Sequence, residues 1–182
     1  MLPPHLKSER ERILEFALGH VPSNGWTEQS LRMATTDAGF EESMSRRAFP
    51  RGISDLIDTY LSKADDVMLE ELEKYSLTAM PIRDRIRSAV RLRLEQSSEQ
   101  REAIRRLIAL QCTPQHAGSA MLALHRTVDK MWRAAGDKSV DFNFYTKRFI
   151  LFLVYSTVIL NFLKNDDLIE IEKLLDDNLY KV

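Results

Sequence analysis

The stretch that decides the fold is residues 27–52, which read TEQSLRMATTDAGFEESMSRRAFPRG. Thr27 is a favourable N-cap for a short helix, and Gly39 suits the C-terminal end of that helix. A second short helix over about residues 42–49 is broken by Pro50-Arg51-Gly52. An apolar helical pattern precedes the stretch and ends at the turn-forming residues Pro22-Ser23-Asn24-Gly25. Residues 1–52 are therefore predicted to form three short helices joined by tight turns.

The rest of the chain keeps the three- and four-residue apolar spacing of amphipathic helices, and no convincing alternating strand pattern is found. The expected helices cover about residues 53–75, 82–106 with a break near Ser97-Ser98, 113–136, 141–163 and 168–180. We therefore expect an all-α protein, with a three-helix unit at residues 1–52 and a larger helical bundle at residues 53–182.

Composition narrows the class of protein. The chain has 182 residues, 44% of them hydrophobic, with 26 Lys and Arg against 27 Asp and Glu. That balance is typical of a folded globular chain and gives no global attraction to nucleic acid or anionic membrane. The single cysteine, Cys112, excludes an internal disulfide and suits a reducing compartment. The first residues lack the apolar run of a signal peptide and the acid-poor pattern of an organelle presequence.

Catalysis and metal binding find little support. The four histidines are scattered, with neither an HExxH nor a Glu-x-x-His pair. No glycine-rich phosphate loop or Gly-x-Ser-x-Gly elbow is found, and Cys112 has no His/Asp constellation in the sequence around it. We expect no catalytic residue, no metal and no enzymatic activity.

The run from Phe149 to Leu163 is apolar nearly all round. About 15 apolar residues give roughly 22 Å of helix, short of the bilayer core of about 30 Å. We expect a helix buried in a bundle or at a subunit interface, where one layer in contact with it is a second subunit or a bound lipid.

The N-terminal part of the chain resembles the helix-turn-helix of TetR-type regulators. The resemblance lies in Thr27, the Leu31–Ala34 pair, Ala38-Gly39-Phe40 and Phe49. Two positions depart from that pattern. Glu41-Glu42 replaces the usual Ser-Lys start of the recognition helix, and Arg46 stands at the phosphate-contacting Tyr position. Acidic groups there repel the DNA backbone, and residues 1–52 hold seven basic and seven acidic side chains. DNA binding is predicted to be lost. The alternative, a TetR-type one-component regulator that binds DNA and a small apolar ligand, rests on Arg46-Arg47.

Residues 128–148, VDKMWRAAGDKSVDFNFYTKR, resemble the signature of the coenzyme Q (ubiquinone) biosynthesis accessory family often called coenzyme Q protein nine. Residues 21–27, VPSNGWT, match its N-terminal pattern. The resemblance implies a TetR-like all-α fold and a homodimer formed through the last two helices. It further implies a non-catalytic protein that binds isoprenoid lipid in its C-terminal bundle and assists the di-iron hydroxylase of demethoxyubiquinone. No cofactor other than bound lipid, an isoprenoid quinone or a phospholipid, is expected.

The resemblance also implies site residues. The partner-binding patch comprises Asp129, Met131, Trp132, Phe144, Tyr145 and Arg148. Met131 and Trp132 also fall on the apolar stripe of their helix, so core packing stays open for both. The predicted lipid-lining residues are Met68, Leu72, Val90, Leu94, Leu107, Met121, Leu124, Phe152 and Tyr155.

Location depends on the source of the chain. We expect the cytoplasm or the cytoplasmic membrane face for a bacterial member, and the matrix side of the inner membrane for a trimmed mitochondrial one. Between residues 83 and 106, eight arginines stand against four acidic residues. A solvated helix face is the simpler interpretation, and peripheral contact with lipid head groups is the alternative.

Overall fold

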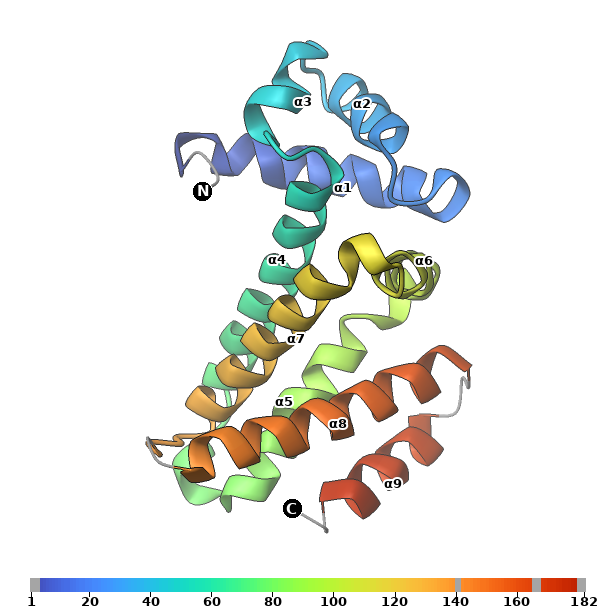
Figure 1. Ribbon diagram of the computed structural model, residues 1–182. Coiled ribbons are helices and arrows are strands. Elements are labelled where there is room, and N and C mark those ends of the chain that lie inside the picture. Colours follow the sequence, from blue (N-terminus) through green and yellow to red (C-terminus); the bar gives the residue numbers. More distant parts are fainter. Residues whose placement is uncertain (1–3, 140–141, 165–167, 180–182) are drawn as a thin grey trace. The chain divides into compact units, whose positions relative to one another are not determined.

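The computed structural model describes residues 4–139, 142–164 and 168–179, which are almost entirely helical (Figure 1). No strand occurs within these ranges, which confirms the predicted all-α class. The α-helices are α1 (Lys7–Asn24), α2 (Glu28–Asp37), α3 (Ser43–Ala48), α4 (Ile53–Glu73), α5 (Ile82–Glu95), α6 (Arg101–Gln111), α7 (Pro114–Ala134), α8 (Phe142–Lys164) and α9 (Leu168–Leu179). Short 3-10 turns lie at Pro4–Leu6, Leu77–Ala79 and Ser98–Gln100. The helix predicted to open at Asp141 begins at Phe142 within the described residues.

Contacts divide the chain into two compact units. The first runs up to Lys63 and includes Gln100–Gly118, whereas the second comprises Ala64–Glu99 and the chain from Ser119 onward. Both α4 and α7 therefore contribute residues to each unit. The sequence-based boundary lay at residue 52, and the contacts instead assign the start of α4 and all of α6 to the first unit.

The first unit is built on α1, which packs against α2 and α6. Thr27 caps α2 as predicted, since its hydroxyl accepts a hydrogen bond from the Ser30 amide at 3.2 Å. The Trp26 indole donates to the Ala103 carbonyl at 2.9 Å and so ties α6 to this unit. Helix α1 ends inside the turn predicted at residues 22–25, although Pro22 itself is still helical. The helix continues to Asn24 and stops at Gly25, whose φ of 71° favours glycine.

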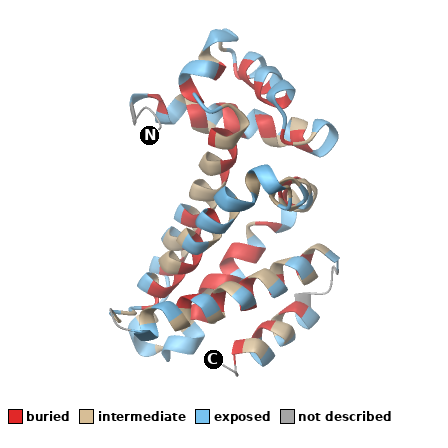
Figure 2. Cartoon of the chain, viewed as in Figure 1, coloured by how far each residue is buried: buried red, intermediate tan, exposed pale blue. Residues whose placement is uncertain are grey.

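The second unit has one continuous apolar core, formed by the end of α4 with α5, α7, α8 and α9 (Figure 2). Its largest fully buried side chains include Met68, Ile86, Met131, Leu151 and Phe162. Charged pairs at the surface join α9 to α5, with Arg87 and Asp176 2.7 Å apart and Arg91 and Glu172 3.2 Å apart. The acidic last helix is thus held by its apolar face and by arginines of α5.

Helix α8 is longer than the sequence estimate. Its 23 residues span about 34 Å, so by length and composition it is able to cross a membrane. The prediction that the run is too short to do so is wrong for the whole helix. One face of α8, which includes Leu151, Val158 and Phe162, is nevertheless buried in the core of the second unit. The core helix of a soluble protein passes the same test of length and composition.

Candidate functional site

A tightly bonded corner begins directly after α7. After Ala134 the chain turns at Gly136, whose φ of 89° lies in the left-handed region. The Gly136 amide donates to the Arg133 carbonyl, and the Asp137 amide donates to the Trp132 carbonyl at 3.0 Å. These two bonds form a Schellman motif, which satisfies the last carbonyls of α7. The corner thus places Asp137 directly beside the first turns of α8.

Two carboxylates brace this corner. Asp137 accepts hydrogen bonds from Lys147 at 2.9 Å and from Arg148 at 3.1 Å. The other end of the Arg148 guanidinium donates to Asp129 of α7 at 2.7 Å. Arg148 is buried, so it spans the two acids in a site largely shielded from water. The network fixes the start of α8 against the end of α7.

The carboxylates are held ionised by their partners. Burial alone would raise the pKa of Asp137, but hydrogen bonds from Lys147, Ser139 and Arg148 outweigh it and lower the pKa from 3.8 to about 2. For Asp129, burial likewise raises the pKa, and hydrogen bonds from Arg148 and Arg133 reverse the effect and leave it lowered. Both acids are therefore charged at neutral pH and bind their cations strongly.

Three of the predicted partner-binding residues lie inside the protein. Met131 is fully buried, and Trp132 is only 5% exposed, with its indole donating to the Lys147 carbonyl at 3.1 Å. Arg148 is buried, with its guanidinium carbon 3.5 Å from the centre of the Phe144 ring. Met131 and Trp132 thus pack in the core, and Arg148 belongs to the brace, which is the network of Asp129, Asp137, Lys147 and Arg148.

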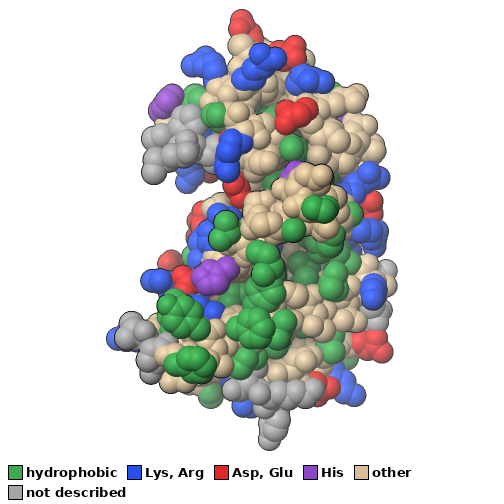
Figure 3. Space-filling model, viewed as in Figure 1, with side chains coloured by type: hydrophobic (Ala, Val, Ile, Leu, Met, Phe, Trp, Pro, Cys, Tyr) green, Lys and Arg blue, Asp and Glu red, His purple; other side chains and the backbone are tan. Residues whose placement is uncertain are grey.

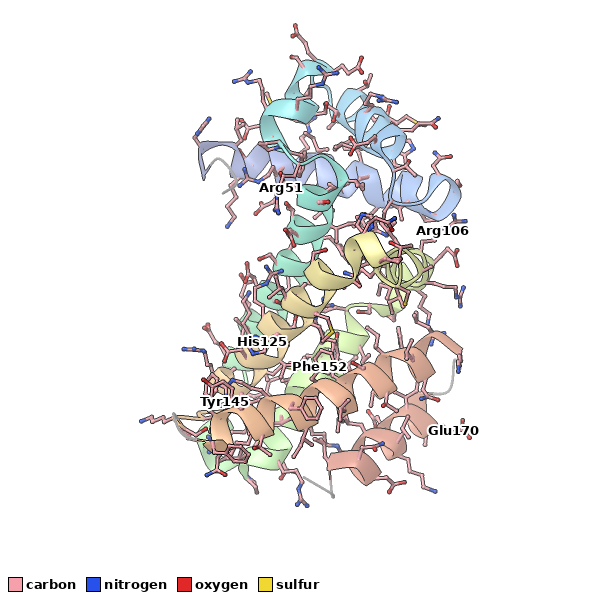
Figure 4. The ribbon with its side chains drawn as sticks, in the orientation of Figure 1. Arg51, Arg106, His125, Tyr145, Phe152 and Glu170 are labelled. Carbon is pink, nitrogen blue, oxygen red and sulfur yellow. The ribbon has the colours of Figure 1, made fainter. Side chains whose placement is uncertain are left out.

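The remaining predicted residues reach the surface to different degrees. Tyr145 is 68% exposed, whereas Phe144 and Asp129 are half-buried. The rings of Phe144 and Tyr145 meet edge to face, with their centres 5.1 Å apart. Figure 4 shows Tyr145 near the start of α8 and Phe152 further along the same helix. Of the predicted patch, Tyr145 is the most accessible.

Tyr145 belongs to an apolar stripe that sequence reasoning missed. Phe142 is 81% exposed and Phe149 62%, and Leu153 and Leu160 are also exposed. The spacing of these five residues places them on one side of α8, opposite its buried face. Figure 3 shows hydrophobic side chains gathered over α7 and α8. Exposed apolar patches of this kind mark interaction sites. The signal was present in the sequence, since a helix apolar nearly all round has a second apolar face.

The predicted lipid-lining residues are mostly packed against one another. Five of them, namely Met68, Leu72, Val90, Leu94 and Tyr155, are buried in the core of the second unit. Leu124 and Phe152 are half-buried against that core. Met121 is exposed on α7, and Leu107 is buried in the first unit, apart from the others.

An open pocket lies elsewhere in the second unit. It has a volume of about 190 Å³ and is lined by Ile82, Arg83, Ile86, Trp132, Leu151 and Leu179. Sites for drug-sized ligands measure about 300–1,000 Å³, so this pocket is too small to enclose a whole polyprenyl chain. Trp132 is the one predicted site residue in its lining.

A buried polar cluster ties three helices of the second unit together. Asp65 of α4 is fully buried, and it lies 3.5 Å from Arg93 of α5 and accepts a hydrogen bond from Thr127 of α7 at 2.9 Å. Lys130 lies 3.7 Å from the same carboxylate. Within the described ranges, no group of three or more His, Cys, Asp or Glu side chains is arranged to hold a metal ion.

The segment that carries these features is similar to known proteins. The family model for COQ9 matches residues 117–182, which include the α7–α8 corner. The mitochondrial ubiquinone biosynthesis protein COQ9 of Drosophila melanogaster is 32% identical over 161 residues, which cover 86% of this chain and 49% of that protein. Human COQ9 is 30% identical over 155 residues, with coverage of 81% and 48%. The chain spans about half the length of these curated relatives.

A solved structure supports the fold. A TetR transcriptional regulator from Nitrosomonas europaea superposes with a TM-score of 0.76 at 18% identity, covering 94% of this chain and 96% of the regulator. The predicted TetR-like fold is therefore confirmed, while identity this low carries no function. The resemblance read from residues 21–27 and 128–148 is confirmed as well, because the chain is similar to the COQ9 proteins of ubiquinone biosynthesis over most of its length.

Proposed function

We propose that this protein acts in ubiquinone biosynthesis as a non-catalytic accessory protein, which binds isoprenoid lipid and presents it to the di-iron demethoxyubiquinone hydroxylase. The curated COQ9 relatives support a role in ubiquinone biosynthesis. The finer proposal is carried by one observation: the exposed aromatic stripe of Phe142, Tyr145 and Phe149 on the braced α7–α8 corner, inside the segment that the COQ9 family model matches.

The corner suits docking for two reasons. Exposed aromatic side chains contribute large apolar contact areas, and such residues are enriched at interaction hot spots. The Asp137–Arg148–Asp129 network holds the first turns of α8 in place, so the stripe is presented as a fixed surface. In this proposal Tyr145 contacts the hydroxylase, and Arg148 is a positioning residue that acts through Phe144 and the two acids.

The second half of the same stripe is assigned to self-association. Leu153 and Leu160 continue the exposed apolar line toward the end of α8. A homodimer through α8 and α9, as the family resemblance implies, would cover these leucines and leave the aromatic end for the hydroxylase. The stripe thus provides separate surfaces for the two partners.

Lipid binding requires space that the apolar side chains of the second unit leave unfilled. Most of the predicted lining residues pack in the core, and we propose that the isoprenoid lies in the pocket beside Trp132 or along the exposed stripe of α8. Native mass spectrometry of the purified protein is expected to reveal a co-purifying lipid. A protein that carries no lipid, together with unchanged quinone levels after deletion of its gene, would contradict this part.

The location follows from the relatives. The proteins of Drosophila and human are both named mitochondrial, which supports a mitochondrial location for this chain. We place its action at the matrix side of the inner membrane, in peripheral contact with the lipid head groups.

Substitution of Tyr145 by Ala tests the docking role. Since Tyr145 is exposed, the free energy of unfolding is expected to change by less than about 0.5 kcal/mol. Loss of a hot-spot aromatic is expected to weaken hydroxylase binding at least about tenfold, as measured by biolayer interferometry. The matched control is Ile169→Ala on α9, an equally exposed apolar side chain away from the stripe, which should leave binding unchanged. Equal binding by the Tyr145 variant and the wild type would overturn the docking role.

The alternative, a TetR-type regulator, has the structural likeness in its favour. Two features argue against a regulator. Helix α3 has only six residues, and glutamates stand at positions 41 and 42 just before it. These groups place negative charge where a recognition helix meets the DNA backbone. We therefore favour the accessory role.

A further inference from the structure

We propose that the outer face of α7 is a second docking surface for a protein partner, on which Arg126 binds a carboxylate of the partner and Leu122 makes the apolar contact beside it. The proposal rests on the proposed function, because the hydroxylase is the partner to be tested. It deepens that function by assigning the charge that the partner has to present at this face. It does not depend on lipid binding.

The outer face of α7 is a row of side chains that leads to the corner. Leu122 and Arg126 lie one helical turn apart, and Asp129 and Arg133 follow on the same side of the helix. Asp129 accepts hydrogen bonds from Arg133 at 2.6 Å and from Arg148 of α8 at 2.7 Å. The row is thus continuous with the braced corner.

The guanidinium of Arg126 is shielded from solvent but unsatisfied. Its Nε and Nη2 atoms are buried, and neither has a hydrogen-bond acceptor in the part of the chain that the structure describes. Two nearby cations of α7 differ in this respect, because Lys130 donates to Asp66 at 2.8 Å and Arg133 donates to Asp129. Buried donors without an acceptor are unfavourable for the folded chain, so Arg126 is suited to an acceptor that comes from outside.

This state of Arg126 favours binding of a carboxylate. A hydrated arginine loses water when it pairs, and that loss offsets much of the attraction between the charges. For Nε and Nη2 of Arg126 the water is already lost, and neither atom breaks a hydrogen bond when the side chain turns toward a partner. A guanidinium binds the two oxygens of a carboxylate with parallel hydrogen bonds, which makes a carboxylate the fitting acceptor.

Leu122 provides the apolar contact next to Arg126. It is 75% exposed, and the neighbouring Met121 is 56% exposed. Protein interfaces combine arginine anchors with apolar contacts that exclude water around them. A partner segment that presents an acidic and an apolar side chain one helical turn apart fits this face.

A protein carboxylate fits the face better than the phosphates of an anionic membrane. Segments that bind such membranes carry clusters of about four to eight cations. Arg126 has acidic neighbours instead, since Asp129 lies one turn further along α7 and Asp66 pairs with Lys130 of the same helix. These acids repel a surface covered with phosphates, whereas one partner carboxylate pairs with Arg126 directly.

Arg126→Met tests the assignment, because it keeps an apolar stem and removes the guanidinium. We expect the full chain with this substitution to bind the hydroxylase at least about tenfold more weakly in biolayer interferometry. We also expect its midpoint of thermal unfolding to rise, since the unsatisfied donors are gone. A lower midpoint would show that Arg126 supports the fold and would overturn the assignment. The matched control is Arg46→Met, at an exposed arginine of the first unit, which should leave binding unchanged.

Two substitutions at Leu122 test the sign of the partner's charge. Leu122→Glu places a carboxylate against that of the partner and should weaken binding at least about tenfold. Leu122→Lys disturbs the same apolar contact but attracts the partner's carboxylate, so it should weaken binding by less than about threefold. Both variants should fold as the wild type does, because the position is exposed. Weaker binding by the lysine variant than by the glutamate variant would reject an acidic partner.

The remaining outcomes separate this inference from the proposed function. Unchanged binding by Arg126→Met, together with weak binding by Tyr145→Ala, would reject this face and leave the docking role of the corner standing. If the wild-type chain binds vesicles of phosphatidylserine and phosphatidylcholine in equal parts, and Arg126→Met abolishes that binding, the face belongs to a membrane and the assignment is overturned. No binding of the hydroxylase by the wild type would overturn both the proposed docking and this inference.

Discussion

At the scale of single residues, Asp137 shows what one residue of the segment 128–148 does in the folded protein. It accepts hydrogen bonds from Lys147, Ser139 and Arg148, although its side chain is almost fully buried. A buried carboxylate is costly unless its partners replace the lost water, and here three donors do so. The acid therefore contributes stability only while it is charged.

Acid titration tests this contribution. The pKa of Asp137 is lowered from 3.8 to about 2 in the folded protein, which corresponds to about 2 kcal/mol of stability at neutral pH. Because the folded pKa lies below the unfolded one, this stability is complete above about pH 4 and is lost as the pH falls toward 2. Asp137→Asn should lower the free energy of unfolding at pH 7 by about that amount, as measured by urea denaturation.

An exposed aspartate, Asp84, provides the control for this acid titration. The stability difference between wild type and Asp137→Asn should shrink between pH 4 and pH 2, whereas Asp84→Asn, at an exposed position, should stay within about 0.5 kcal/mol throughout. A difference that does not change with pH would show that Asp137 contributes by shape and not by charge.

Residue roles within the motif were only partly predictable from the sequence. Tyr145, which the family resemblance put in the partner-binding patch, is exposed, and the packing alternative for Met131 and Trp132 followed from their place on the apolar stripe of α7. The brace was not predictable, because Asp129, Asp137 and Arg148 are separated by eight and eleven positions. Nothing in helical spacing indicates that a turn at Gly136 brings these three charges together.

At the scale of elements, α8 has two apolar faces with different tasks. One face is buried with Leu151, Val158 and Phe162, and the other exposes Phe149, Leu153 and other side chains. Periodicity locates one apolar stripe on a helix, but it does not distinguish the core side from the partner side when both are apolar. The helix was therefore predictable from the sequence, whereas its exposed face required the structure.

Substitutions at the end of this stripe test self-association. Leu153→Glu and Leu160→Glu place charge on the exposed side of α8, where a second copy would have to bury it. We expect the wild type to sediment as a dimer and the double variant as a folded monomer. The control Leu122→Glu, an exposed leucine on α7 outside the two helices of the proposed interface, should remain dimeric. A dimeric Leu153/Leu160 variant would place the subunit interface elsewhere.

The Asp65 cluster is a second feature at this scale, since it joins α4, α5 and α7 within the second unit. Asp65→Ala leaves the buried Arg93 charge without this partner and should lower the free energy of unfolding by about 3–5 kcal/mol. Replacement of both partners, Asp65→Leu with Arg93→Met, should recover much of that loss, because a well-packed apolar pair costs no desolvation. Denaturation that gives additive losses instead would show that the pair is not coupled.

At the scale of the whole molecule, the charge distribution separates this chain from DNA-binding relatives of its fold. The net charge is −1, and residues 1–52 hold equal numbers of basic and acidic groups. Proteins that bind DNA show a basic footprint, because most of their affinity comes from phosphate contacts. The fold is shared with a regulator, and residues 1–52 hold no excess of basic groups, so we expect DNA binding to be weak or absent.

A mobility-shift assay at about 50 mM salt tests this conclusion. Electrostatic attraction is strongest at low salt, so the absence of a retarded band across genomic fragments would agree with the proposal. A band that weakens steeply as salt rises would favour the regulator. In that case Arg46→Gln with Arg47→Gln should abolish it, and Lys74→Gln on α4 should have no effect.

The Schellman turn at Gly136 has a consequence for the thermodynamics of docking. The backbone and side-chain freedom of the first turns of α8 is already lost when the chain folds, because the turn and the Asp137–Arg148 brace hold them. A partner therefore meets a preorganised surface and little further entropy is lost on association. Gly136→Val would strain the turn and leave the first turns of α8 less fixed. These turns would then lose their freedom on binding instead of on folding. The affinity for the partner would fall although every aromatic side chain of the stripe is still present.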